Sequence, residues 1–429
     1  MPTALNFSTT ESEIAGISVH ELARRFGTPT YVYDAAKIVE RVGDVEAFDV
    51  VRFAQKACSN LAIVDLVRRH GALVDTVSAG EIGRALAAGY QPGGQPPRIV
   101  YTADIFDRES LSLVIEHDIH VNCGSPEMID QLGERAPKSD ITLRINPGFG
   151  HGHSQKTNTG GEQSKHGIWH TELTDCQQRA SRHAMTITGL HMHIGSGTDM
   201  EHLRQVCAAM ETAVRQLGPS IRSISAGGGL PVPYRAGEAF IDLGAYFKIW
   251  NVTRKRLQQE FGHPISLEIE PGRFLTAESG SLIAEIRAVK QMGGNTFYLV
   301  DAGFNNLARP ILYGAYHPMA IAVADREEAA GKATARPERE VVVGGPLCES
   351  GDIFTQEEGG FVATRRLPEA QVGDLLVIGC AGAYGFVMGS NYNSQPLAAE
   401  VLIQGGQAHP IRTRQTLSDL LRGETIPSV

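Results

Sequence analysis

The sequence predicts an α/β protein in which a (β/α)8 TIM barrel is followed by a mostly antiparallel β domain. Eight short apolar segments alternate with helical stretches between residues 50 and 270. Polar, charged or glycine residues stand at the ends of most of these segments, and after Gly280 strand-like segments follow one another without long helices. Strands separated by helices run parallel, and eight of them close a barrel whose chemistry lies at the C-terminal strand ends. An open, doubly wound sheet is the alternative.

The composition excludes several classes of protein. With 429 residues, 42% of them apolar and 20% charged, the chain can form two domains with buried cores and is not a disordered protein. Its formal charge of −9 and the lack of a basic tract argue against nucleic acid or an anionic membrane as partner. No apolar run approaches the roughly 18 residues of a transmembrane helix, and no signal peptide is visible. The six cysteines form no C-x-x-C pair, so we expect reduced thiols in a cytoplasmic protein.

Three segments are expected along the chain. Residues 1–29 form an N-terminal segment with a helix at 19–26, which we expect to pack on the β domain. Residues 30–279 form the barrel, and they begin with a strand at 30–33 and a helix capped by Asp34. The eight barrel strands are predicted at residues 50–55, 73–78, 98–103, 119–123, 141–146, 187–194, 221–226 and 265–270. Residues 280–429 form the β domain, with strands at 281–291, 295–303, 339–347, 374–382 and 397–413.

Lys56 comes directly after the first barrel strand, at the predicted mouth of the barrel. A lysine in this position is ordinarily solvated. At a barrel mouth it can instead lose its water, and a desolvated lysine amine can form a Schiff base with a carbonyl compound. The residue alone leaves both interpretations open.

Glycines and histidines mark the ends of later strands. Gly227, Gly228 and Gly229 end the seventh strand and favour either close approach of an anion to backbone N–H groups or a flexible turn. His191 and His193 share one face of a strand. They could hold a metal, lie in the core or stack on an aromatic cofactor, and we expect no metal because no third ligand stands at a convincing spacing. The loop at 148–167 is long enough to form a lid.

Motifs along nearly the whole chain resemble one family. The segments FAQKA at 53–57, HMHIGSG at 191–197, GGG at 227–229 and EPGR at 270–273 resemble the fold type III pyridoxal-phosphate-dependent decarboxylases. NNLARPILYGAYH at 305–317, GPLCESGD at 345–352, GAYG at 382–385 and SNYN at 390–393 are similar to the diaminopimelate decarboxylases among them. The loop at 146–160 is similar to that of their bacterial form. His166 and Met192 differ from the commoner family pattern, which has Phe and Cys there.

The resemblance implies that pyridoxal 5'-phosphate (PLP) is the cofactor. It makes Lys56 the lysine that forms a Schiff base with PLP, Glu270 the partner of the pyridine nitrogen and His193 the residue stacked on the ring. Together with Cys348, Lys56 and His193 are the implied catalytic residues. The remaining implied cofactor-binding residues are Ser196, Gly227, Gly228, Gly229, Gly272, Arg273 and Tyr384.

The resemblance also implies a substrate and an assembly. The substrate is meso-2,6-diaminoheptanedioate (meso-diaminopimelate), which loses the carboxylate at its D centre to give L-lysine and CO2 in the last step of lysine biosynthesis. Its binding residues would be Arg309 and Tyr313 for the distal carboxylate, Glu349 for the distal ammonium, Tyr384, and Arg273, which contacts either the phosphate or the substrate. Cys348 would deliver a proton to the carbanion. In this family the Cys348 and Glu349 positions reach the neighbouring subunit's cofactor, so a homodimer with shared active sites is implied.

Three other functions are compatible with parts of the pattern. A decarboxylase of ornithine, arginine or a carboxylated polyamine could share the fold, but its substrate would not need Arg309. A non-catalytic cofactor-binding protein would lack the β domain with its Cys348–Glu349 pair. A barrel racemase would release no CO2.

Overall fold

A closed barrel of eight parallel strands forms the larger part of the computed structural model, which describes residues 7–150, 158–195, 200–322 and 336–428. Its strands are β4 (Val50–Ala54), β5 (Leu73–Thr76), β6 (Ile99–Ala103), β7 (His120–Cys123), β8 (Asp140–Asn146), β10 (Thr186–His191), β11 (Ser223–Ser225) and β12 (Ser266–Ile269). The barrel closes because β8 pairs with β10 and β12 pairs with β4. The predicted barrel is confirmed strand by strand. A short strand that was not predicted, β9 (Ile168–Trp169), pairs with β8.

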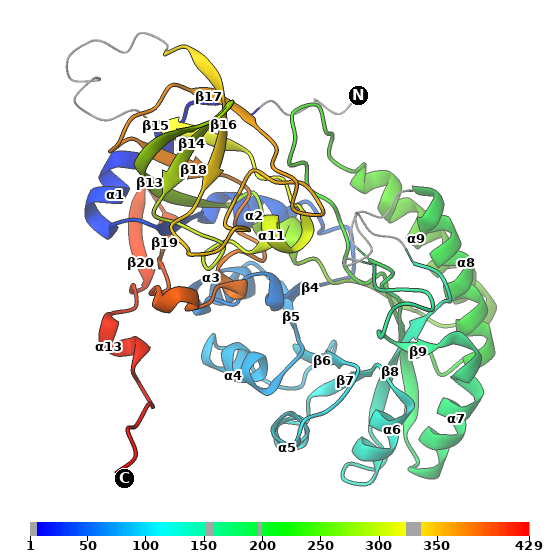
Figure 1. Ribbon diagram of the computed structural model, residues 1–429. Helices are drawn as coiled ribbons and strands as arrows, with labels where there is room; N and C mark the ends of the chain where they lie inside the picture. The colour runs from blue at the N-terminus through cyan, green and yellow to red at the C-terminus, as the bar shows by residue number, and fades with distance from the viewer. Residues whose placement is uncertain (1–6, 151–157, 196–199, 323–335, 429) are drawn as a thin grey trace.

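Helices precede or connect the barrel strands and cover the outside of the barrel (Figure 1). They are α2 (Ala35–Gly43), α3 (Leu61–Arg69), α4 (Ala79–Ala87), α5 (Arg108–Glu116), α6 (Pro126–Gly133), α7 (Leu173–Arg182), α8 (Met200–Leu217) and α9 (Leu243–Phe261). Their ends follow local rules. The Asn60 side chain caps α3 by accepting the Ala62 N–H at 3.0 Å. Helix α9 ends at Gly262, whose φ of 73° suits a residue without Cβ.

A second sheet forms the predicted, mostly antiparallel β domain. Its strands after residue 279 are β13 (Gly280–Met292), β14 (Asn295–Val300), β15 (Met319–Ala322), β16 (Glu338–Gly344), β17 (Arg365–Pro368), β18 (Leu375–Ile378), β19 (Ala399–Gln404) and β20 (Gln407–Arg412). Two short helices lie beside the barrel mouth, α10 (Arg273–Thr276) and α11 (Arg309–Tyr313), and α13 (Leu417–Leu420) follows the last strand.

The strand predicted at 30–33 forms as β3 (Thr30–Asp34), but it belongs to the second sheet. It pairs antiparallel with β13 and parallel with β19. Assigning residues 30–34 to the barrel was therefore wrong, because these residues complete the β domain before the chain enters the barrel at α2. A strand's sequence indicates that it is extended but not which strand it pairs with.

The N-terminal residues pack against the β domain. Thr10 forms a bridge with Ile321 of β15, and the short strands β1 (Glu13–Ile14) and β2 (Ile17–Ser18) lead into α1 (Val19–Phe26). Val19 and Leu22 of α1 are fully buried in a cluster with strand residues of the β domain. Burial of each such side chain stabilises the fold by about 1.5–3 kcal/mol.

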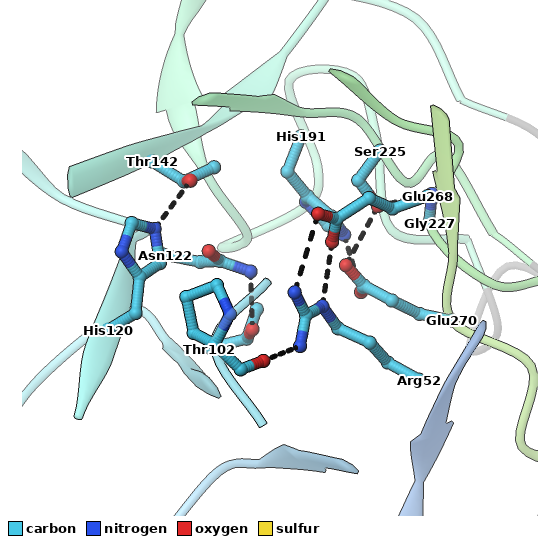
Figure 2. Close-up of polar contacts among 11 residues, drawn as sticks. Arg52, Thr102, His120, Asn122, Thr142, His191, Ser225, Gly227, Glu268 and Glu270 are labelled. Carbon is cyan, nitrogen blue, oxygen red and sulfur yellow. Dashed lines mark hydrogen bonds and ion pairs between the residues drawn. The ribbon is translucent and has the colours of Figure 1, made fainter. Parts of the chain in front are cut away.

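The barrel interior contains a buried ion pair beneath the site described below (Figure 2). Arg52 Nε donates to Glu268 Oε2 at 2.7 Å, and the two side chains are only 2% and 11% exposed. Arg52 Nη1 also donates to the Pro97 carbonyl. The guanidinium therefore joins β4, β12 and the segment that precedes β6.

Within the described residues, no helix is both long and apolar enough to span a bilayer.

Replacing Arg52 with alanine should destabilise the protein strongly. The substitution leaves the Glu268 carboxylate buried without its cation, which costs about 3–5 kcal/mol of unfolding free energy. Urea unfolding followed by circular dichroism measures this loss. As the control, Arg204→Ala removes an exposed arginine paired with Glu201 and should change stability by no more than about 0.5 kcal/mol. Equal losses in the two variants would contradict the importance of the buried pair.

Candidate active site

A cavity of about 910 Å³ opens at the C-terminal ends of the barrel strands, between the barrel and residues of the β domain. Most residues that the sequence analysis assigned to cofactor or substrate line it, although they come from distant parts of the chain. They are Lys56, His193, Gly228, Gly229, Glu270, Gly272, Arg273, Arg309, Tyr313 and Tyr384. The cavity therefore lies where barrel enzymes carry their chemistry.

Lys56 projects into the cavity from a single 3-10 turn, Gln55–Ala57, that follows β4. Its Nζ lies 3.2 Å from Oδ2 of Asp75 on the neighbouring strand β5. Loss of water lowers the pKa of Lys56, but the acidic groups around it, of which Asp75 acts most strongly, together outweigh this effect and leave the pKa above its usual value. In the chain alone Lys56 is therefore an ammonium group held by Asp75. Sequence reasoning missed Asp75, although an aspartate inside an apolar strand is a usable signal.

Glu270 lies directly after β12 and is held by two neighbours (Figure 2). His191 Nε2 is 2.8 Å from Glu270 Oε2, and the Ser225 hydroxyl donates to Oε1 at 2.8 Å. Burial raises the pKa of Glu270, but His191, Ser225 and the charge on Lys56 together hold it well below its usual value. The carboxylate is therefore ionised at the base of the cavity.

His193 lies beyond the end of β10, beside the cavity. Burial and the neighbouring Arg144 and His191 lower the pKa of His193 well below its usual value. Its imidazole is therefore neutral, as suits a ring that packs against an aromatic group. His191 and His193 were considered as a metal pair, but His191 bonds to Glu270. No group of three metal-ligating side chains was found among the described residues.

The three glycines bring strand ends close together. A Cβ atom on Gly228 would lie 2.6 Å from the Glu270 carbonyl oxygen, and one on Gly229 would lie 2.3 Å from that of Gly195. The N–H groups of Gly228 and Gly229, which line the cavity, have no hydrogen-bond acceptor among the described residues. Such free N–H groups suit an anion. Gly227 lies behind them and donates to the Ser225 hydroxyl at 3.1 Å.

Two arginines, the buried Arg309 and the half-buried Arg273, face the cavity without a carboxylate partner among the described residues. Arg273 donates to the Tyr234 hydroxyl at 3.1 Å and lies over the Tyr384 ring. Arg309 is 6% exposed and donates from Nη1 to His317 Nε2 at 2.9 Å, and its buried Nε has no partner. A buried cation is costly unless an anion pairs with it. The presence of these two arginines at the cavity therefore indicates an anionic ligand.

Several predicted site residues lie elsewhere. Cys348 and Glu349 do not line the cavity within this chain; both are exposed, and the Cys348 N–H donates to Asn393 Oδ1 at 2.7 Å. Ser196 and residues 151–157 of the predicted lid lie outside the described residues. Near the other end of that loop, His166 Nδ1 is 2.6 Å from Asp104 Oδ2.

The residues that are present fit PLP at three points. Lys56 supplies an amine for the aldehyde, Glu270 an ionised carboxylate for the pyridine nitrogen, and the glycine N–H groups with the half-buried Arg273 suit the phosphate. The cavity volume of about 910 Å³ is ample for the cofactor together with an amino-acid substrate.

Comparisons with known proteins agree with this geometry. Residues 36–277 match the model of the pyridoxal-dependent decarboxylase family, pyridoxal binding domain. Diaminopimelate decarboxylase of Escherichia coli is 53% identical over 99% of this chain and 100% of its own. That of Streptomyces coelicolor is 53% identical over 94% and 91%. A crystal structure of diaminopimelate decarboxylase, 54% identical, superposes with a TM-score of 0.90 over 94% of each chain. This chain therefore belongs to the diaminopimelate decarboxylases, within the pyridoxal-dependent decarboxylase family.

Proposed function

We propose that this chain is a PLP-dependent carboxy-lyase that removes the carboxylate at the D centre of meso-diaminopimelate and yields L-lysine and CO2. The choice of substrate rests mainly on Arg309, a buried arginine that faces the cavity. Its Nε has no hydrogen-bond partner, and its guanidinium has no carboxylate partner among the described residues. A basic amino acid such as ornithine carries a distal ammonium but no distal carboxylate, and it would leave this cation uncompensated.

The chain's own residues would hold the cofactor at both ends. When bound, PLP supplies an electron-withdrawing ring that stabilises the electron pair left by the departing CO2. Lys56 would hold its aldehyde end through the side-chain amine, and Asp75 would hold that amine as an ammonium group whenever it is free. Glu270 would keep the pyridine nitrogen protonated, since a nearby anion favours the charged form of that nitrogen. His193 would pack on the ring as a neutral imidazole.

Arg309 and Tyr313 of α11 would bind the distal carboxylate of the substrate. A guanidinium can bind both carboxylate oxygens in a fork, and His317 orients this one by accepting from Nη1. Tyr384 would contact both cofactor and substrate. Arg273, beside Tyr384 and Tyr234, would bind either the phosphate or the carboxylate that is not lost.

A homodimer with shared sites would bring Cys348 and Glu349 to the cavity of the partner. Within one chain these residues are exposed and do not line the cavity, which supports a site that a second copy completes. Cys348 would then protonate the carbanion, and Glu349 would bind the distal ammonium. All six cysteines are free thiols, which supports a reducing compartment such as the cytoplasm.

Mixing two inactive mutants should test the shared site. Lys56→Ala and Cys348→Ala homodimers should each turn over poorly. If the site is shared, a mixed dimer contains one site with both substitutions and one with neither. Because random pairing makes about half of the dimers mixed, activity should return to about a quarter of the wild-type value. A tag pull-down confirms subunit exchange. If the subunits exchange but no activity returns, Cys348 acts in the site of its own chain.

An assay of the purified protein tests the proposed function itself. The protein as purified should absorb in the near-ultraviolet and visible range of protein-bound PLP. Addition of meso-diaminopimelate should release one CO2 and one L-lysine per substrate consumed. Protein that carries PLP but releases no CO2 from this substrate would contradict the proposal.

A further inference from the structure

His191 is a buried titratable residue to which the proposed function gives no role. It is the last residue of β10, and its side chain is 2% exposed. Figure 2 shows its ring directed at the Glu270 carboxylate. Sequence reasoning left His191 with three roles, as metal ligand, core residue or stacking partner. Its contact with Glu270 indicates a fourth.

The hydrogen bonds around Glu270 determine where the protons lie. Ser225 Oγ accepts the N–H of Gly227 at 3.1 Å, so its own hydrogen is free to go to Glu270 Oε1 at 2.8 Å. The Glu270 backbone N–H donates in turn to the Gly227 carbonyl at 2.8 Å. One carboxylate oxygen is thereby tied to the end of β11 and to the glycine segment.

The other carboxylate oxygen depends on His191. An ionised carboxylate only accepts hydrogen bonds, so the hydrogen between Glu270 Oε2 and His191 Nε2 must lie on the imidazole. His191 Nδ1 is buried and has no partner among the described residues. The Glu270 contact is therefore the hydrogen bond that fixes the ring. Each carboxylate oxygen receives one such donor, which leaves a lone pair for a third donor from the cavity.

We propose that His191 is a positioning residue for the decarboxylation, whose Nε2–H holds Glu270 ionised and aimed at the pyridine nitrogen of PLP. Through Glu270 it keeps that nitrogen protonated, and the protonated ring withdraws electrons best. Ser225 performs the same task at the other oxygen and links it to the glycine segment. This inference rests on the proposed function, because it assumes that PLP occupies the cavity.

Substitutions of His191 separate this role from a packing role. His191→Leu fills similar space without an N–H donor, and His191→Gln restores a donor of similar reach. His120→Leu is the matched control: this barrel histidine bonds through Nε2 to Thr142 Oγ1 at 2.9 Å and does not touch Glu270 (Figure 2). Losing one preorganised donor should lower kcat on the order of 100-fold in His191→Leu, with KM changed less than about threefold. His191→Gln should recover to within about tenfold of wild type.

A spectroscopic readout does not depend on turnover. Apoenzyme of each variant is loaded with PLP labelled with 15N in the ring, and the 15N chemical shift reports whether the pyridine nitrogen carries a proton. Wild type, His191→Gln and His120→Leu should give the protonated shift, and His191→Leu should move toward the neutral shift. Thermal unfolding of each variant shows whether it is folded, and if His191→Leu does not fold, His191→Asn takes its place because its amide is too short to reach Glu270.

The outcomes distinguish this inference from the proposed function. If the wild-type protein releases no CO2 from meso-diaminopimelate, the proposed function itself is contradicted. If wild type is active and His191→Leu keeps both the rate of His120→Leu and the protonated shift, only the role of His191 is overturned. A slower His191→Leu enzyme with an unchanged 15N shift would also overturn it, because the histidine would then act only in packing.

Discussion

Lys56→Ala should abolish decarboxylation, with a loss in kcat of at least about 10³-fold. The variant lacks the amine that faces the cavity from the turn after β4. The purified protein should also lose the absorption band of lysine-bound PLP. After reduction with borohydride, wild type should carry the cofactor on the peptide that contains Lys56, and the variant should carry none there.

Lys37→Ala is the matched control for this substitution. Lys37 is a surface lysine of α2 paired with Glu40 at 2.7 Å, and it does not line the cavity. It should keep the absorption band and wild-type turnover. A Lys56→Ala enzyme with full activity and a reducible adduct at this site would refute the assignment of Lys56.

Arg309→Lys should lower kcat/KM for meso-diaminopimelate by about 10- to 1000-fold, the size of one strong polar contact. Lysine keeps the positive charge but loses the planar fork that binds two carboxylate oxygens. It also loses the Nη1 donor to His317. Selectivity over substrates without a distal carboxylate should suffer more than the chemical step, so most of the loss is expected in KM.

Arg41→Lys is the control for this substitution. Arg41 is also a buried arginine, but Glu278 and Asp44 pair with it and it does not line the cavity. Its replacement should affect stability without changing the preference between substrates. Unchanged kinetics in Arg309→Lys would mean that the distal carboxylate is bound elsewhere.

The eight barrel strands were predictable because each is a short apolar segment followed by a turn, a signal that stays local in the sequence. The pairing of β3 was not predictable in this way. Thr30 meets Ile283 and Ala399 across the sheet, residues more than 250 positions away. Nothing near residue 30 indicates those partners. The chain therefore contributes its first long strand to the domain that it completes last.

Only some residues of the candidate site could be predicted, because the others depend on contacts between distant parts of the chain. Lys56 and the glycines could be singled out because they end strands, and the resemblance supplied roles for Glu270 and Arg309. Asp75, Ser225 and the link from His191 to Glu270 depend on which side chains face one another across the barrel. Spacing along the chain does not carry that information. The roles of Cys348 and Glu349 stay predictions, because the cavity of one chain does not include them.

The central claim is that this cavity decarboxylates an amino acid with a distal carboxylate, and a comparison of two substrates tests it most directly. CO2 release is measured with meso-diaminopimelate and with L-ornithine under the same conditions. A site built to bind a charged group rejects a substrate that lacks it, so kcat/KM should favour meso-diaminopimelate by about 10³-fold or more. Equal or faster release of CO2 from L-ornithine would contradict the claim.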